Sequence, residues 1–278
     1  MTDSLQFGFI NNQHGFTISF IEGHELIKQI SNIHNIGPNA LEFYRKTVLG
    51  STQLINFLKP GENLGFYIDS EEPYFKFKIE MSHNGSLRTL LLPEDFEDFP
   101  RKFTGKCRVN KIIQGKAPYT SVLDYKDFPI ENIVNEVMEK SYQTNSRVYM
   151  SEDFSSSLML TKLPPTNINK KIEDYEDLSF ADMLEEYKEL VNSALKLKNT
   201  TVEETEKLFS KYEFNYLGSK SVKFHCPCSH ERMVGNLYTL KQSDINEIFS
   251  EDNQIETRCD YCNIIYTIKK EEVIKKLQ

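Results

Sequence analysis

Two short cysteine motifs near the C-terminus, Cys226-Pro227-Cys228 and Cys259-Asp260-Tyr261-Cys262, hold four of the chain's five cysteines. Close cysteine pairs joined across a loop are typical of a metal site when the start of the chain shows no secretion signal, because disulfide frameworks belong to oxidising compartments. Thiolates in a tetrahedral set favour zinc, and a shell of four cysteines leaves no position for a catalytic water. The spacing therefore predicts one structural or regulatory Zn²⁺ site, with Cys226, Cys228, Cys259 and Cys262 as its ligands.

Two histidines flank the first motif. Either His225 or His230 is able to replace a cysteine as ligand, although a neighbouring histidine is more often a solvated loop residue. The alternative to a metal site is two unrelated pairs of buried or free cysteines. Cys107 lies outside both motifs, and we expect it to be a small buried residue in a strand, or otherwise a stray redox-active thiol.

The module around these motifs, residues 221–278, is too small to rely on a hydrophobic core alone. Structural zinc contributes about 10 to 16 kcal/mol to the folding of such modules, so loss of the ion should unfold this one. Zinc holds cysteines as thiolates, which is the form that peroxide or hypochlorous acid attacks. We therefore expect oxidation to disulfides to release zinc, unfold the module and loosen the segment before it.

That preceding segment is charged and amphipathic. Residues 166–215 contain twelve acidic and seven basic side chains, with apolar residues at helical spacing between them. Ser179 with Asp182, and Thr201 with Glu204, predict the N-caps of a longer and a shorter helix. Isolated helices of this length are only marginally stable in water, so we expect both to pack against another part of the chain. The apolar positions of the longer helix are Phe180, Met183, Leu184, Tyr187, Leu190, Val191, Ala194 and Leu195.

The N-terminal residues predict helices and antiparallel strands that do not alternate regularly. Asn84-Gly85 between two alternating runs predicts a hairpin with a type I′ turn, in which both central residues have positive φ. Helical spacing predicts helices at about 26–33, 39–57 and 130–138. Apolar alternation and β-prone runs predict strands at 16–20, 64–68, 75–81, 87–91, 108–113, 119–123, 147–150 and 157–163.

The chain is thus expected to be an α+β protein in three parts. Residues 1–165 form a mixed domain of helices and antiparallel sheet that ends at Pro164-Pro165, and residues 166–220 form an amphipathic, redox-sensitive helical linker. Residues 221–278 form a small four-cysteine zinc module that acts as the redox switch.

Composition excludes several function classes. A net charge of −8 argues against general affinity for nucleic acid or anionic membrane. Residues 221–278 have eight basic against nine acidic side chains, so the module is not a basic DNA-binding finger. The chain starts without a basic leader and contains no run of about eighteen apolar residues, so we expect a cytoplasmic protein.

The sequence does not predict an enzyme. The N-terminal part contains no nucleophile elbow, phosphate-binding loop or dinucleotide-binding motif. We expect its acidic residues Glu94, Asp95, Glu97 and Asp98 to form a solvated loop.

The stretch from Phe224 to Tyr266, which contains both cysteine motifs and the residues between them, resembles the redox-regulated heat-shock chaperones of thirty-three kilodaltons, a family of zinc-binding holdases. Weaker similarity in the residues before the module extends the resemblance over most of the chain. Two places depart from the family: its usual glycine after the second motif is Asn263 here, and the turn near Asp69 to Pro73 lacks the family's glycines. The matching residues are Phe224 to Ser229, Glu231-Arg232, Leu237, Leu240, Ile245 to Ile248, Glu251-Asp252, Ile255-Glu256, Cys259 to Cys262 and Tyr266.

The resemblance implies an ATP-independent molecular chaperone that holds unfolding proteins under oxidative stress and is inactive while reduced and zinc-bound. It implies that oxidation forms the disulfides Cys226–Cys228 and Cys259–Cys262, releases zinc and unfolds the linker. It also implies that the oxidised chain forms a homodimer and that its partners are unfolded or misfolded client proteins.

A second hypothesis is a constitutive zinc-ribbon interaction module in which zinc is purely structural. The charged amphipathic linker favours the chaperone, because a switch needs a marginally stable element. A reversible gain of anti-aggregation activity on oxidation would distinguish the two.

Overall fold

The computed structural model describes residues 3–164 and 178–274, and it divides into two compact units, one up to Phe224 and one from His225 onward. In the first unit the elements are β1 (Ser4–Asn11), β2 (Phe16–Glu22), α1 (His24–Ile33), α2 (Pro38–Thr52), the 3₁₀ segment η1 (Gln53–Phe57), β3 (Asn63–Glu72), β4 (Tyr74–Ser82), β5 (Ser86–Leu92), β6 (Lys102–Ile112), β7 (Tyr119–Pro129), the 3₁₀ segment η2 (Ile130–Asn132), α3 (Ile133–Lys140), β8 (Ser146–Met150), β9 (Ser156–Lys162), α4 (Phe180–Glu186), α5 (Lys188–Ala194), α6 (Val202–Ser210) and β10 (Asn215–Phe224). In the second unit they are α7 (His230–Leu237), α8 (Gln242–Ile248), β11 (Gln254–Arg258), β12 (Ile265–Lys269) and α9 (Lys270–Ile274).

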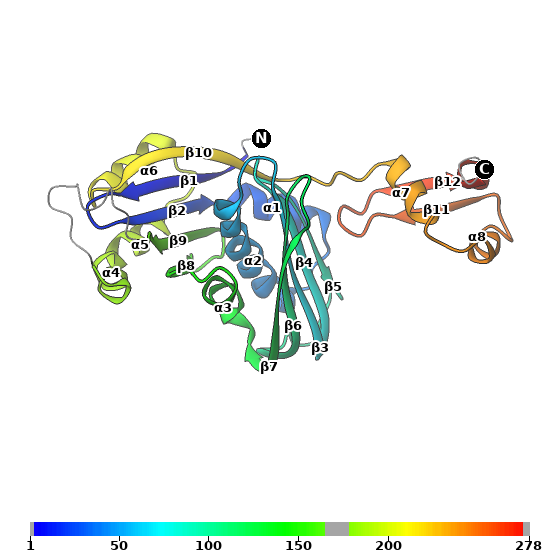
Figure 1. Cartoon of the computed structure of the whole chain (residues 1–278), viewed down its shortest axis with the longest axis horizontal. Coiled ribbons are helices and arrows are strands. Elements are labelled where there is room, and N and C mark those ends of the chain that lie inside the picture. The colour runs from blue at the N-terminus through cyan, green and yellow to red at the C-terminus, as the bar shows by residue number, and fades with distance from the viewer. Residues whose placement is uncertain (1–2, 165–177, 275–278) are drawn as a thin grey trace. The chain divides into compact units, whose positions relative to one another are not determined.

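The first unit is built on a ten-stranded sheet in the order β7-β6-β3-β4-β5-β10-β1-β2-β9-β8 (Figure 1). All neighbouring strands are antiparallel except β10 and β5, which are parallel. Strand β10 therefore joins the β5 side of the sheet to the β1 side. The predicted α+β class is confirmed, and residues 215–220, at the end of the predicted linker, lie in this strand.

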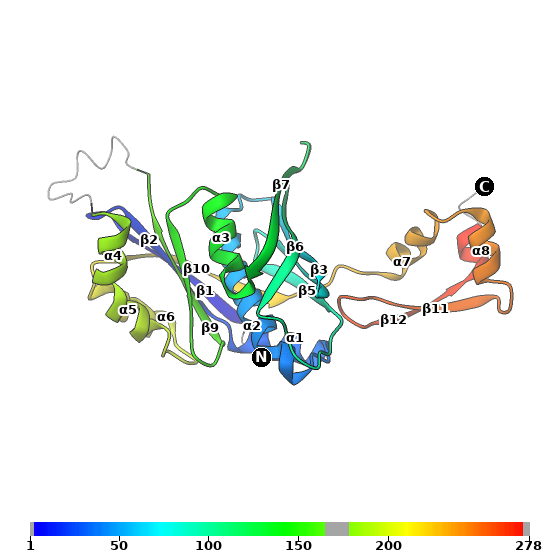
Figure 2. The same ribbon diagram turned by 90° about the horizontal axis from the view of Figure 1, so that it is seen from below.

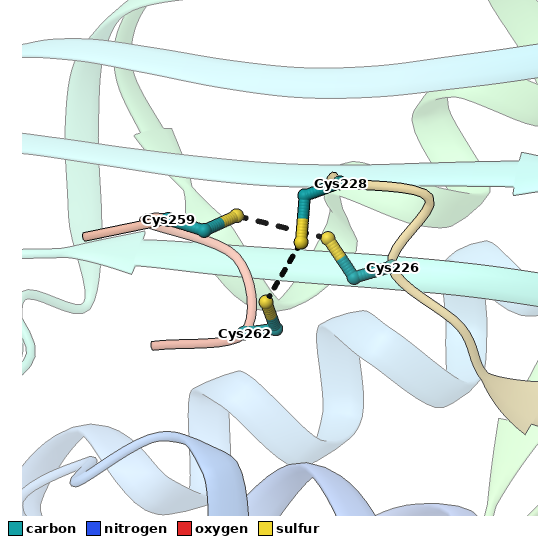
Figure 3. Close-up of side chains that lie close together, drawn as sticks. All are labelled: Cys226, Cys228, Cys259 and Cys262. Carbon is teal, nitrogen blue, oxygen red and sulfur yellow. Dashed lines mark hydrogen bonds between the residues drawn. The ribbon is translucent and has the colours of Figure 1, made fainter. Parts of the chain in front are cut away.

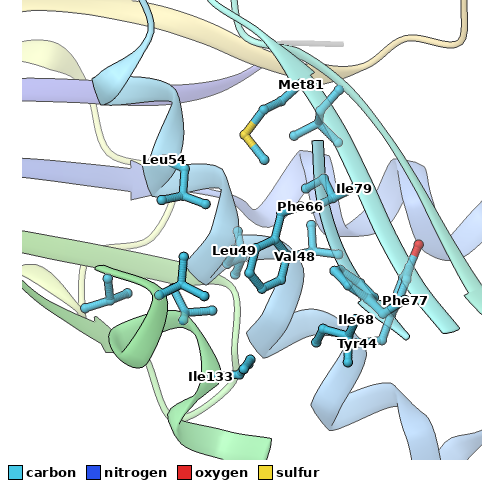
Figure 4. Close-up of a cluster of buried hydrophobic side chains, with 14 of the residues drawn as sticks. Tyr44, Val48, Leu49, Leu54, Phe66, Ile68, Phe77, Ile79, Met81 and Ile133 are labelled. Carbon is cyan, nitrogen blue, oxygen red and sulfur yellow. The ribbon is translucent and has the colours of Figure 1, made fainter. Parts of the chain in front are cut away.

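The main hydrophobic core of the first unit lies between α2, α3 and the β3–β6 part of the sheet (Figure 4). Tyr44 and Val48 project from α2 toward Phe66 and Phe77 on β3 and β4, and all four side chains are buried. The predicted helix over 39–57 is α-helical only as far as Thr52, and η1 completes it. Because this core does not involve the linker helices, the sheet and α1–α3 have a source of stability of their own.

The hairpin predicted at Asn84-Gly85 is present between β4 and β5, but its turn is not type I′. Of the two residues, only Gly85 has positive φ, at 89°. The loop has three residues, because β4 ends at Ser82 and β5 begins at Ser86, and the Gly85 amide donates to the Ser82 carbonyl at 3.0 Å. This three-residue loop, a tight turn followed by a left-handed glycine, matches the twist of the strands as the two-residue type I′ loop does. The Asn-Gly pair is compatible with both loops, so it does not distinguish them.

The linker helices α4, α5 and α6 cover one face of β1, β2 and β9, as Figures 1 and 2 show. Their N-caps are as predicted: Ser179 accepts from the Asp182 amide, and Thr201 and Glu204 form a complete capping box. The longer predicted helix is divided at Tyr187 into α4 and α5. The predicted domain end at Pro165 and the start of the predicted linker lie outside the described residues.

The second unit packs α7, α8 and α9 with the β11–β12 hairpin around a small apolar cluster. Five side chains form its buried centre: Val234, Ile245, Phe249, Ile268 and Val273. In the described residues of both units, no helix is long and apolar enough to cross a membrane.

Candidate metal centre

Two local structures in the second unit carry the four cysteines. Cys226 and Cys228 lie in the extended segment before α7, whose N-cap Ser229 accepts a hydrogen bond from the Arg232 amide at 3.3 Å. Cys259 and Cys262 lie in the tight loop that joins β11 to β12. The helix cap and the hairpin therefore fix the two ends of the site.

The loop that carries the second motif is closed by backbone hydrogen bonds. The Cys259 amide donates to the Ile264 carbonyl at 2.9 Å, and the Asn263 amide donates to the Cys259 carbonyl at 2.8 Å. Asn263 has φ 60°, a left-handed conformation that glycine and asparagine tolerate best. The asparagine at this position thus retains the backbone turn that glycine would allow.

The four cysteine sulfur atoms converge in one cluster (Figure 3). All four Sγ atoms lie within 4.8 Å of one another, with Cys226 and Cys259 at 3.7 Å and Cys228 and Cys262 at 3.2 Å. A tetrahedral zinc ion with Zn–S bonds of about 2.3 Å requires sulfur atoms about 3.8 Å apart. The separation and the soft thiolate chemistry of the donor set therefore fit a zinc ion.

A tyrosine hydroxyl joins the sulfur cluster. Tyr266, on β12, lies with its hydroxyl oxygen 3.0 Å from Cys228 Sγ. Burial acts to raise the pKa of Cys228, but hydrogen bonds from Tyr266 and the other cysteines outweigh it and lower that pKa. The same contact raises the pKa of Tyr266 to about 12. Tyr266 therefore stays protonated, and its hydroxyl is placed to donate a hydrogen bond to Cys228 Sγ, a contact that the cysteine spacing does not predict.

The two flanking histidines are not part of the cluster. The group of candidate ligands in the described second unit consists of the four cysteines. His230 Nε2 instead lies 2.8 Å from Glu272 Oε1 on α9. Glu272 also accepts from the Lys269 amide at 2.8 Å, so this contact ties α7 to the end of the hairpin.

Cys107 does not belong to the cluster of candidate metal ligands. It lies in the middle of β6, between Ile68 on β3 and Leu123 on β7, and is 1% exposed. Burial raises the pKa of its thiol, so it stays protonated and unreactive. The prediction of a small buried residue is confirmed.

The acidic residues 94–98 form the loop between β5 and β6. Asp95, Glu97 and Asp98 are exposed, as expected of a solvated loop. Glu94 is partly buried and lies 3.4 Å from the Nδ1 atom of His34.

The linker helices make an extensive apolar contact with the sheet. Phe209 on α6 is fully buried, and its ring stacks on Phe9 of β1 with ring centres 4.2 Å apart. Met183, Leu190 and the other inward residues of α4 and α5 complete a cluster that is separate from the main core. A shared apolar surface therefore holds the linker helices on the sheet.

Polar contacts also hold the linker helices in a defined position on the sheet. The Tyr187 hydroxyl lies 2.9 Å from His14 Nδ1 and accepts from Asn11 Nδ2 at 3.2 Å, and all three side chains are buried. Nearer the start of α6, Lys198 forms an ion pair with Asp153 at 2.6 Å. The break between α4 and α5 at Tyr187 thus coincides with a polar anchor.

Comparison with known proteins gives one consistent result. The family model described as "Hsp33 protein" matches residues 4–269. A "33 kDa chaperonin" of Thermosipho melanesiensis is 22% identical, with 94% of each chain covered, and one of Aquifex aeolicus is 22% identical over 92% of this chain and 84% of its own.

Local and structural similarity agree with the family match. A "33 kDa chaperonin" of Shewanella baltica is 40% identical over 60 residues, which cover 22% of this chain and 21% of its own. The crystal structure of the 33 kDa chaperonin from Thermotoga maritima has the same fold, with a TM-score of 0.73 at 16% identity over 100% of this chain and 98% of that one. From the match over residues 4–269 we conclude that the chain belongs to the Hsp33 family, whose members are chaperones rather than enzymes.

Proposed function

We propose that this protein is a redox-regulated, ATP-independent holdase. Cys226, Cys228, Cys259 and Cys262 hold one Zn²⁺ ion in the reduced, inactive form. Bound zinc keeps all four side chains as thiolates and links the segment before α7 to the β11–β12 loop. Because the apolar centre of this unit is small, with five buried residues among those that the structure describes, we propose that zinc supplies much of its stability.

The observation that carries the proposal is the apolar sheet face beneath α4–α6. Phe7, Phe9, Phe16, Ile18 and Phe20 lie on β1 and β2 under the linker helices and are at most 1% exposed. Undocking of the helices would expose these side chains together with the apolar faces of the helices. Such a surface suits unfolding proteins of unrelated sequence, because hydrophobic contact has no directional requirement.

The redox step is proposed to form the disulfides Cys226–Cys228 and Cys259–Cys262. Peroxide takes two electrons from each pair of thiolates and two protons from solvent, which gives one disulfide and two water molecules per pair. The resemblance to the family supports this pairing. The Sγ distances of 3.7 Å between Cys226 and Cys259 and 3.2 Å between Cys228 and Cys262 do not by themselves favour it over the crossed pairing. The zinc ligands are thereby lost in pairs.

The remaining steps follow from loss of the zinc module. We propose that the module, residues 221–278, unfolds and that the linker, residues 166–220, then leaves the domain of residues 1–165. The oxidised chain would form a homodimer and hold unfolded or misfolded client proteins in the cytoplasm until reducing conditions return.

The decisive experiment is light scattering of a denatured client protein that aggregates on dilution. The reduced, zinc-loaded chain is compared with the peroxide-treated chain while a chromogenic chelator reports released zinc. We expect only the oxidised chain to suppress aggregation, in step with zinc release, and the effect to reverse on reduction.

Variants separate the switch from its alternative. Cys107→Ala removes a buried thiol outside the cluster and should leave switching unchanged, whereas Cys228→Ser should lose tight zinc binding. Peptide mapping of the oxidised chain tests the disulfide pairing directly. Zinc release without any gain of holding activity would instead indicate a constitutive zinc-ribbon module.

A further inference from the structure

A cavity of about 350 Å³ lies in the first unit between α1, α2 and the turn from β8 to β9. Its polar lining includes His24, Lys28 and Ser31 from α1, and Arg45 from α2. Asp153 and Ser155 contribute from the turn.

The polar side chains from α1 form one row. His24, Lys28 and Ser31 are spaced four and three residues apart, which places them on one face of the helix. Leu26 and Ile30 are buried in the main core. Helix α1 therefore lines the cavity with a row of polar residues.

Arg45 brings an unbalanced positive charge to this cavity. Its side chain is partly buried, its Nε atom is inaccessible to solvent, and it makes no hydrogen bond or ion pair with the described residues. The hydroxyl of Ser31 is also buried without a protein partner among these residues. Both atoms are closed to solvent and do not open into the cavity, so the donors left for an anion are the terminal nitrogens of Arg45, which have no partner among the described residues.

Asp153, the carboxylate in the described lining of the cavity, does not neutralise Arg45. Asp153 Oδ2 accepts from Lys198 at 2.6 Å, and its Oδ1 accepts from the hydroxyls of Ser151 and Ser155 at 2.8 and 2.7 Å. The hydrogen bond from Lys198 is the main reason that the pKa of Asp153 lies well below its usual value. Asp153 is therefore ionised and satisfied, and the charge of Arg45 is left for another anion.

We propose that this cavity binds a small phosphate-bearing anion. The terminal nitrogens of the Arg45 guanidinium match two oxygens of a phosphate, and Lys28, whose Nζ lies 3.5 Å from Glu25 Oε1, adds positive charge at the rim. A volume of about 350 Å³ lies at the lower end of small-molecule sites, so the cavity accommodates a small phosphomonoester as well as inorganic phosphate. This site does not depend on the cysteine switch.

The test is a two-dimensional amide NMR titration of the reduced, zinc-loaded full chain at constant ionic strength. Inorganic phosphate and glycerol phosphate are titrated separately. We expect saturable shifts confined to residues 24–32, Arg45 and its neighbours, and 153–155. Tighter binding of glycerol phosphate would identify a phosphomonoester site, and equal binding would identify a phosphate site.

Variants define which residue is responsible. Arg45→Gln should weaken phosphate binding at least tenfold, and Arg45→Lys, which lacks the paired donors of the guanidinium, should weaken it several-fold without a change of net charge. The matched control is Arg147→Gln, because Arg147 is an exposed arginine on β8 outside the cavity. Equal binding by Arg45→Gln and Arg147→Gln, or linear shifts spread over the surface, would show that phosphate only screens charge and would overturn the proposal.

Discussion

Replacement of Phe209 by alanine should release the linker helices without oxidation. Phe209 is fully buried on α6, with its ring centre 4.2 Å from that of Phe9 and 6.2 Å from that of Phe20. Truncation of a buried phenylalanine costs about 3 to 5 kcal/mol. Because the ring lies between the linker and the sheet, the lost free energy weakens docking of the linker on the sheet. The equilibrium constant for docking falls by roughly two to nearly four powers of ten.

The assay uses the reduced, zinc-loaded variant. We expect limited proteolysis to cut within the linker, and we expect client aggregation to be suppressed before any peroxide is added. Zinc content should remain at one ion per chain, which separates linker release from loss of the metal site.

The matched control is Phe103→Ala. Phe103 is 1% exposed on β6 and belongs to the main core, so its truncation should lower the free energy of unfolding by a similar amount and leave the linker docked. If Phe209→Ala is as protease-resistant and inactive as the reduced wild type, linker docking does not inhibit the chaperone. If both variants become active, general instability rather than the linker surface is responsible.

Three further predictions follow from the linker contacts and the cysteine cluster. Tyr187→Phe keeps the packing but leaves buried polar partners unsatisfied, so linker docking should weaken by about 1 to 3 kcal/mol, measured as faster proteolysis of the reduced chain. Cys259→Ser together with Cys262→Ser should abolish tight zinc binding, measured by metal analysis, and leave the linker permanently loosened; full zinc content would contradict the ligand assignment. The folded-state pKa of Asp153 is lowered by Lys198, so its contribution to docking is present above pH about 4 and lost as the pH falls below it. Asp153→Asn should therefore remove a part of the acid sensitivity of linker proteolysis, and an unchanged pH profile would show that this ion pair does not hold the linker.

Local sequence signals predicted the elements that depend on local chemistry. The caps at Ser179 and Thr201 form as expected, because a side chain satisfies the free amides of its own helix. Strand β2 was expected from alternation, because one face of the sheet is buried beneath α4–α6. Strand β10 was missed: most of its residues are exposed or partly exposed, so its sequence does not alternate, and it is a strand because β1 and β5 pair with it.

The cysteine cluster was predictable from spacing, since its residues lie in two short motifs. The contact from Tyr266 was not, because it depends on how β12 returns past the second motif. The polar anchor of Asn11, His14 and Tyr187 was also missed. Tyr187 is more than 170 positions from Asn11 and His14 in the chain, and no pattern in either segment indicates the pairing.

The position of the linker between two strands of the same sheet has a consequence for reversibility. Strand β9 ends at Lys162 and β10 begins at Asn215, and both strands are hydrogen-bonded into the ten-stranded sheet. If β10 stays paired and only residues 163–214 leave the sheet, these become a closed loop of about fifty residues, whose entropy gain is smaller than that of a free chain end. Such a loop stays tethered beside its docking surface. Redocking of the helices on the sheet is then an intramolecular step whose rate does not depend on protein concentration. A client protein must compete for the sheet surface with a high local concentration of the chain's own helices.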